Sequence, residues 1–218
     1  TLSASEVNFR DSTQVRLAVA TPGDIHYTLN GSDPTVKSAK TKGELTVSEA
    51  ATVKAAVFKG ERRVSEIETL TLHKITESEW RDRLFVHDIR GKGSANSYKV
   101  ELEGLQRGTL VYADRSYTFT EISEALAGAT HIRTHNDDKS KTNPEFLRFE
   151  INLPATLYLA YDGRTEPPKA LVAGMEKTDM AVSMSNGESF PVYRRTVEAG
   201  VVVLGGNKLG GSGGESMY

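Results

Sequence analysis

Hydrophobic and polar residues alternate in short runs along the whole chain. In residues 15–19, 25–29 and 156–161, residues of similar polarity recur at every second position. This is the period of a β-strand with one buried face. Apolar stripes at helical spacing are short and occur only near residues 78–84 and 122–126. The pattern therefore predicts an all-β protein. The expected strands are residues 15–19, 25–29, 44–47, 51–58, 67–72, 84–89, 98–102, 108–113, 117–119, 130–134, 146–151, 156–161, 190–194 and 201–204.

The first five of these strands recur about every ten residues, which is typical of a small sandwich. Asn30 and Gly31 supply the positive φ angles of a tight hairpin turn between two of them. The run 51–58 has the composition of a central strand. We expect residues 1–75 to form one domain.

Two segments of this domain carry a family resemblance. The residues IHYTLNGSDPT at 25–35 and TVKAAV at 52–57 resemble the chitobiase/β-hexosaminidase C-terminal-type domain, over about residues 5–72. Asn30 stands where the family more often has Asp, and either residue suits the turn. The resemblance implies a small immunoglobulin-like sandwich that is usually non-catalytic and appended to secreted carbohydrate-active enzymes.

Residues 76–83 are polar and surround Trp80, the single tryptophan, so we interpret them as a linker. Thr76 or Ser78 can cap a short helix there, supported by Glu79. An indole ring can stack on the apolar face of a sugar, or it can lie as a wedge between two domains. We favour the wedge.

The remaining strands predict a second, larger, jelly-roll-like β-sandwich over residues 84–218. The glycine-rich run 205–214 is expected to be a loop whose partner lies beyond residue 218, or a frayed tail. Segments at 114–119, 126–139, 158–164 and 200–207 resemble a β-sandwich module of secreted bacterial polysaccharide-degrading proteins, which implies a glycan-related context. Where that pattern continues with a tryptophan, this chain has Ala170, which weakens the case for a stacking platform at that position.

Composition excludes several function classes. Twenty-seven basic and 29 acidic residues nearly balance, so no overall field favours nucleic acid or an anionic membrane. No apolar run approaches the roughly 18 residues of a membrane span. The chain has no cysteine, which excludes disulfides and thiolate metal sites.

Three groups of residues are candidate sites. Asn136, Asp137 and Asp138 offer oxygen ligands for Ca²⁺, the only cofactor that the sequence suggests. The alternatives are a ligand contact or a turn held by side-chain hydrogen bonds, with Lys139 pairing locally.

The second group is His131, Arg133 and His135, which would share one face of a strand. Arg133 is a forked donor for sulfate or carboxylate, so these residues are candidates for binding an anionic glycan. The competing interpretation is a solvated strand face. A zinc site is not supported, because His spacing of four residues converges only on a helix.

The third group is Arg115, Asp162 and Arg164, which lie beside aromatic residues such as Tyr117. Arginine and aspartate can hydrogen-bond sugar hydroxyls while a nearby ring stacks on the sugar. The same residues would equally form a buried Arg–Asp pair within the sandwich. The sequence leaves both interpretations open.

Catalytic motifs find little support. Residues 210–214 match GxSxG but lie in low-complexity glycine, and adjacent Asp137 and Asp138 point apart in an extended chain.

The favoured hypothesis is a non-catalytic carbohydrate-binding region of a secreted or cell-surface polysaccharide-degrading enzyme, for an anionic (sulfated or uronic) glycan. The catalytic domain would lie elsewhere in the parent chain. The alternatives are a structural spacer or surface-assembly module, and a glycoside hydrolase or polysaccharide lyase fragment.

Overall fold

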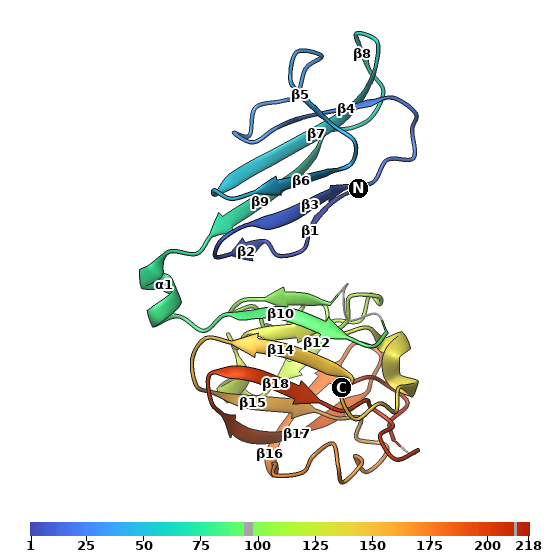
Figure 1. The fold of residues 1–218 in the computed structure, drawn as a ribbon. Helices are drawn as coiled ribbons and strands as arrows, with labels where there is room; N and C mark the ends of the chain where they lie inside the picture. Colours follow the sequence, from blue (N-terminus) through green and yellow to red (C-terminus); the bar gives the residue numbers. More distant parts are fainter. Residues whose placement is uncertain (94–97, 212) are drawn as a thin grey trace. The chain divides into compact units, whose positions relative to one another are not determined.

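A computed structural model describes residues 1–93, 98–211 and 213–218 (Figure 1). Within them the chain is built almost wholly of β-strands, as the alternating pattern predicted. It divides into two compact units, Thr1–Trp80 and Arg81–Tyr218. Among the described residues, no helix is long and apolar enough to cross a membrane.

The first unit contains two sheets. Strand β3 is the middle of one sheet and pairs antiparallel with both neighbours. Strand β7 lies at the centre of the other, so its expected central position is confirmed. The smaller sheet has the order β1 (Leu2–Ala4), β3 (Thr13–Leu17), β6 (Glu44–Val47). The larger has the order β2 (Asn8–Phe9), β9 (Glu68–Lys74), β7 (Ala51–Lys59), β4 (Asp24–Thr28), β5 (Ala39–Thr41), with β8 (Arg62–Arg63) also paired to β7.

The core of this unit follows directly from the alternation. Along β3 the side chains of Val15 and Leu17 are buried while those of Gln14 and Arg16 are exposed. Such period-two burial leaves one apolar face on each strand, and the faces of the two sheets pack together. The buried cluster consists of Phe9, Val15, Leu17, Ile25, Val47, Val53, Ala55 and Leu72.

The turn at Asn30 and Gly31 differs from the expectation. Gly31 has the predicted positive φ of 77°. However, β4 and β5 are joined by the longer connection 29–38, not by a two-residue turn. The Asn30 side chain accepts a hydrogen bond from the Ser32 backbone N–H at 3.1 Å, and the Gly31 N–H donates to the Thr52 carbonyl at 2.8 Å. The pair thus fixes a loop against β7.

Helix α1 (Glu77–Asp82) begins with a capping box. The Glu79 carboxylate accepts hydrogen bonds from the Thr76 backbone N–H and hydroxyl, each at 2.8 Å, and the Glu79 N–H donates to the Thr76 hydroxyl at 3.2 Å. The bond from the Thr76 N–H is the main reason why the pKa of Glu79 falls to about 2. Trp80 carries the Arg10 guanidinium over its ring, 5.0 Å from the centroid.

The second unit is the larger sandwich. One sheet has β14 at its centre, and the other has β16 and β17 as its inner strands. Two short 3₁₀ helices, η2 (Glu124–Leu126) and η3 (Asn136–Ser140), lie in the connections. The sheets are β10 (Val86–Gly91), β14 (Leu147–Ile151), β18 (Gly200–Leu204); β12 (Phe119–Ile122), β16 (Glu176–Met184), β17 (Ser189–Val197), β15 (Ala155–Ala160); and the pair β11 (Lys99–Glu101), β13 (His131–Arg133).

The strand prediction for this unit fails at two places, and the strand expected at 117–119 begins only at Phe119, as β12. Residues 108–113 contribute only an isolated bridge between Leu110 and Thr118, because the segment turns at Gly108 and again after Val111. Strand β16 was not predicted at all. Its inward positions include Met180, Val182 and Met184, which carry a weaker β signal than the valine- and tyrosine-rich runs.

The glycine-rich end of the chain is part of the second unit and not a frayed tail. The Asn207 side chain is fully buried, and its amide nitrogen donates to the carbonyls of Lys139, Gly214 and Ser216 at 3.1–3.2 Å. The Tyr112 hydroxyl donates to the Met217 carbonyl at 2.7 Å. Ser212, in the GxSxG match, lies outside the described residues. Residues 205–211 and 213–218 are therefore held by the rest of the unit.

Candidate functional site

Arg115 is held in a small acidic cluster at one edge of the second unit. Its guanidinium donates to the Asp114 carboxylate at 3.0 Å and also to Asp137. The bond with Asp137 is the main reason why the pKa of Arg115 is raised. The Asp114 carboxylate also accepts the backbone N–H groups of Asn136 and Asp137, at 2.8 and 3.1 Å. Asp114 therefore ties the Arg115 loop to helix η3.

Asn136, Asp137 and Asp138 each bond to a different partner. The Asn136 side-chain oxygen accepts the Met217 N–H at 2.9 Å, and Asp138 accepts the buried Tyr98 hydroxyl at 2.9 Å. Asp137 instead pairs with Arg115. Within residues 1–93, 98–211 and 213–218, no three His, Cys, Asp or Glu side chains converge as metal ligands. The hydrogen bonds of Asn136 and Asp138 are those of a turn held by its own side chains.

His131, Arg133 and His135 do not form a solvated face. Strand β13 ends at Arg133, and the His135 ring stacks on Tyr98 with centroids 5.6 Å apart. Arg133 donates to the Glu101 carboxylate at 2.7 Å and to the Tyr112 carbonyl at 3.3 Å. Arg133 and His135 therefore have contacts within the fold, with Glu101 and Tyr98 respectively.

Asp162 and Arg164 form an ion pair in which Asp162 is buried and Arg164 is about half exposed. Arg164 donates from Nε and Nη2 to the two Asp162 oxygens, at 2.8 and 2.7 Å. The same Asp162 carboxylate accepts the backbone N–H groups of Glu215 and Ser216 at 2.8 and 3.0 Å. Arg164 also pairs with Glu188 at 2.8 Å. The pair thus fixes the C-terminal segment.

The hydrogen bonds set the charge of Asp162. Burial alone would raise its pKa, but the bonds from the Arg164 side chain and backbone and from the Glu215 N–H outweigh burial and lower the pKa to about 2. Asp162 is consequently a carboxylate at neutral pH, and its charge is matched by Arg164.

The predicted site residues fall into separate clusters. Arg115 and Asp137 lie together, with Asn136 attached through Asp114, and Tyr117 is half-buried two residues from Arg115. Asp162 and Arg164 form a second cluster. The C-terminal segment joins the two, because Ser216 bonds to Asp162 and Met217 bonds to Asn136.

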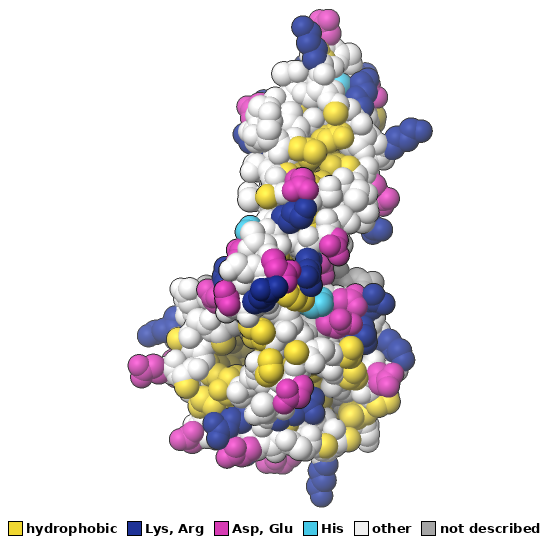
Figure 2. Space-filling model, turned by 60° about the vertical axis from the view of Figure 1, so that its left-hand side comes forward, with side chains coloured by type: hydrophobic (Ala, Val, Ile, Leu, Met, Phe, Trp, Pro, Cys, Tyr) yellow, Lys and Arg dark blue, Asp and Glu magenta, His cyan; other side chains and the backbone are white. Residues whose placement is uncertain are grey.

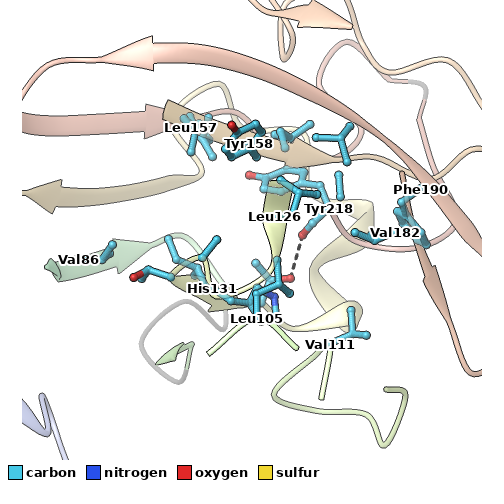
Figure 3. A pocket seen from close by; sticks show the side chains of 18 of the residues that line it. Val86, Leu105, Val111, Leu126, His131, Leu157, Tyr158, Val182, Phe190 and Tyr218 are labelled. Atoms are coloured by element: carbon cyan, nitrogen blue, oxygen red, sulfur yellow. Dashed lines mark hydrogen bonds between the residues drawn. The ribbon is translucent and has the colours of Figure 1, made fainter. Parts of the chain in front are cut away.

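Sequence reasoning missed a cavity in the second unit. It has a volume of about 410 Å³ and is lined by side chains from both main sheets and from β13 (Figure 3). Thr134, on the cavity wall, donates its hydroxyl to the Tyr218 carbonyl at 2.9 Å. No single run of the sequence signals this cavity, because its walls come from strands that are far apart in the chain.

Charge is mixed over the surface in view. On the face that Figure 2 shows, Lys and Arg side chains are interspersed with Asp and Glu side chains. The three candidate arginines also have carboxylate partners: Arg115 with Asp137, Arg133 with Glu101, and Arg164 with Asp162. Pairing of this kind fixes loops and reduces the attraction that a free cation would exert on an anionic ligand.

Comparison with known proteins places the first unit in a family context. Residues 4–69 match the family described as chitobiase/β-hexosaminidase C-terminal domain. The resemblance found in the sequence is confirmed. None of the curated proteins matches the chain. The match relates this chain to accessory domains of glycoside hydrolases.

Two solved structures are similar to the chain. A β-glucuronidase from glycoside hydrolase family 2 aligns with 95% of this chain at 19% identity, with a TM-score of 0.55. The alignment covers 27% of that enzyme, so this chain spans about a quarter of its length. A GH138 enzyme targeting pectin rhamnogalacturonan II aligns with 57% of this chain and 16% of its own at 15% identity, with a TM-score of 0.40. The first likeness supports the β-sandwich fold.

Proposed function

We propose that this chain is a non-catalytic accessory region of a secreted glycoside hydrolase, in which its two β-sandwich units support the catalytic part of a longer protein. The observation that carries the proposal is the match of residues 4–69 to a chitobiase/β-hexosaminidase C-terminal domain. A domain of this kind contributes by its fold and attachment and needs no chemistry of its own.

The contacts of the candidate site residues favour a structural role. Asp162 and Arg164 hold the C-terminal segment, and Asp114 and Arg115 hold helix η3. The charged groups of these residues form their hydrogen bonds and ion pairs with other parts of the same unit. Charged side chains that each fix a loop are expected in a rigid module that presents no reacting group.

A hydrolysis assay tests the non-catalytic assignment. The purified chain is incubated with a panel of aryl glycosides and polysaccharides, and released sugar is measured. We expect no turnover above the rate with boiled protein. Turnover that follows the protein through purification would overturn the proposal and favour the hydrolase or lyase fragment.

Glycan binding is a second candidate function, and one observation favours it. The side chains of Arg115 and Arg164 are 32% and 49% exposed, so part of each guanidinium faces solvent despite its carboxylate partners. At Arg115 the partner Asp137 is 69% exposed and half-buried Tyr117 lies nearby, which together offer donors, an acceptor and a ring to a sugar. A sulfated or uronic glycan would compete with Asp137 for the guanidinium.

Affinity electrophoresis distinguishes the two functions. The chain is run through gels containing neutral or anionic polysaccharides, at two salt concentrations. Glycan binding predicts retardation by an anionic polysaccharide that weakens with salt and is lost in Arg115→Ala, but not in the control Arg62→Ala on exposed β8. Equal mobility in all gels would reject glycan binding and leave structural support as the proposed function.

A further inference from the structure

The cavity of the second unit is lined mainly by apolar side chains that the two main sheets direct inward. Strand β14 contributes Leu147, Phe149 and Ile151, and β16 contributes Val182 and Met184. A volume of about 410 Å³ falls within the range of roughly 300–1,000 Å³ in which proteins bind small molecules. Protein interiors are otherwise close-packed, so a hollow of this size between two sheets is unusual. Its lining would gain dispersion contacts from an apolar occupant.

The cavity reaches the surface on one side. Of its lining residues, Thr156 is exposed, and Leu84, Val86 and Tyr158 are only half-buried. Figure 3 shows Leu157 and Tyr158 on one wall with Val86 and His131 on the opposite wall. A small molecule can therefore enter beside the first residues of β10 and β15.

His131 is the chemically distinctive side chain of the lining. Its Nδ1 is buried and has no hydrogen-bond partner, while its ring packs edge-on against Phe119 with centroids 5.2 Å apart. Burial, together with the nearby charge of Arg133, lowers the pKa of His131 to about 4, so the imidazole is neutral at pH 7. A buried polar atom without a partner is unfavourable, and a ligand group that bonds to it removes that cost.

The rest of the lining restricts the ligand class. None of the described lining residues is Asp, Glu, Lys or Arg. A carboxylate or ammonium placed among them would be desolvated without an ion pair, which is strongly unfavourable. Hydroxyl and carbonyl groups need only one hydrogen bond and tolerate such a site.

We propose that this cavity binds an uncharged small molecule with an aromatic or alkyl body and a single hydroxyl or carbonyl group, which hydrogen-bonds to His131. The body occupies the space between the sheets and contacts their apolar side chains. The polar group lies on the β13 side, next to the imidazole. This activity is separate from glycan binding, because the cavity walls suit an apolar body and not a sugar.

Three matched probes test the ligand class. 2-Naphthol, naphthalene and 2-naphthoate share one ring system and differ in carrying a hydroxyl, no polar group or a carboxylate. We expect calorimetry or fluorescence titration at pH 7 to show saturable one-to-one binding of 2-naphthol. Affinity for naphthalene should be about three- to tenfold weaker, as for loss of one hydrogen bond. Naphthoate should bind at least tenfold more weakly than 2-naphthol. Absence of saturable 2-naphthol binding, or naphthoate binding as tight as 2-naphthol binding, would overturn the proposal.

Variants locate the site. His131→Phe should reduce 2-naphthol affinity about three- to tenfold and leave naphthalene affinity unchanged, since only the hydrogen bond is removed. Val86→Trp should abolish binding of both, because the larger ring projects into the cavity near its entrance. Its matched control is Val201→Trp, at a 52% exposed position of the same sheet outside the lining. Unchanged 2-naphthol binding by both His131→Phe and Val86→Trp would refute the assignment to this cavity.

Discussion

Replacing Asp162 by asparagine should destabilise the second unit strongly. Asp162 is 1% exposed, and its Oδ2 accepts bonds from the N–H groups of Glu215 and Ser216 and from Arg164. Its Oδ1 accepts bonds from the Arg164 backbone N–H and Nε. An asparagine side chain presents an NH₂ group in place of one of the two oxygens, so in either orientation it cannot accept the bonds made to that oxygen. At least two donors would lose their acceptor, and Arg164 would lose one of its two counter-charges, keeping only Glu188.

The expected cost follows from these contacts. Each buried donor left without a partner costs about 1–3 kcal/mol. Loss of the ion pair adds less than it would for a fully buried pair, because the Arg164 side chain is 49% exposed. Because the terms overlap, we expect the free energy of unfolding to fall by about 3–5 kcal/mol at pH 7 in Asp162→Asn.

The ionisation of Asp162 gives a second, pH-dependent signature. Folding lowers its pKa from 3.8 to about 2, which is worth roughly 2 kcal/mol of stability at neutral pH. Because the folded pKa is the lower one, this contribution is present above pH 4 and is lost as the pH falls to about 2. Asp162→Asn should lack this part of the acid dependence.

Urea denaturation at pH 7 and pH 3, followed by hydrogen exchange of peptides from residues 205–218, measures both effects on the relevant unit. Asp179→Asn is the matched control, because Asp179 is exposed on β16, and its stability should stay within about 0.5 kcal/mol of wild type. A loss below 1 kcal/mol in Asp162→Asn, or an unchanged acid dependence, would refute the role given to this carboxylate.

Three further substitutions test other contacts. Asn207→Ala removes a buried amide whose two N–H groups are shared among three backbone carbonyls, so we expect a loss of about 3 kcal/mol in thermal denaturation and faster hydrogen exchange in residues 213–218. Gly206→Ala would place Cβ 2.3 Å from the Lys141 carbonyl oxygen, so the backbone must shift, and a lower melting temperature of the second unit should result. Leu72→Ala, at a 2% exposed position of β9, should cost about 2–5 kcal/mol, measurable as the urea midpoint of the first unit; a cost near zero would contradict its place in that core.

The strands were predictable because their signal is local. Residues 44–47 form β6 with the predicted bounds, and residues 201–204 form all but the first residue of β18, since Val, Thr and Leu predominate in both runs. Strand β16 was not predicted because its first four residues, Glu176–Asp179, are all polar and only Val182 and Met184 along it are buried. Tertiary pairing with β12 and β17 makes this segment a strand.

The candidate site was only partly predictable, for a different physical reason. The sequence identified Asp162 and Arg164 as a pair, but it could not choose between a ligand site and a buried network. The choice depends on Glu188, Glu215 and Ser216, which folding brings from distant parts of the chain. His131 was selected for its charge, whereas its burial makes it neutral. Long-range packing decides both outcomes.

The packing of the C-terminal residues 213–218 against the rest of the second unit has a consequence for folding during synthesis. The Tyr112 hydroxyl, the Asn136 side-chain oxygen and the Asp162 carboxylate each form hydrogen bonds with residues 215–217. On the ribosome, the first unit can fold as soon as residue 80 has emerged. The second unit must keep its inner surfaces incomplete while 138 more residues, Arg81–Tyr218, are translated, which takes on the order of ten seconds. During that interval the nascent second unit exposes apolar strands, so chaperone contact matters more for it than for the first unit.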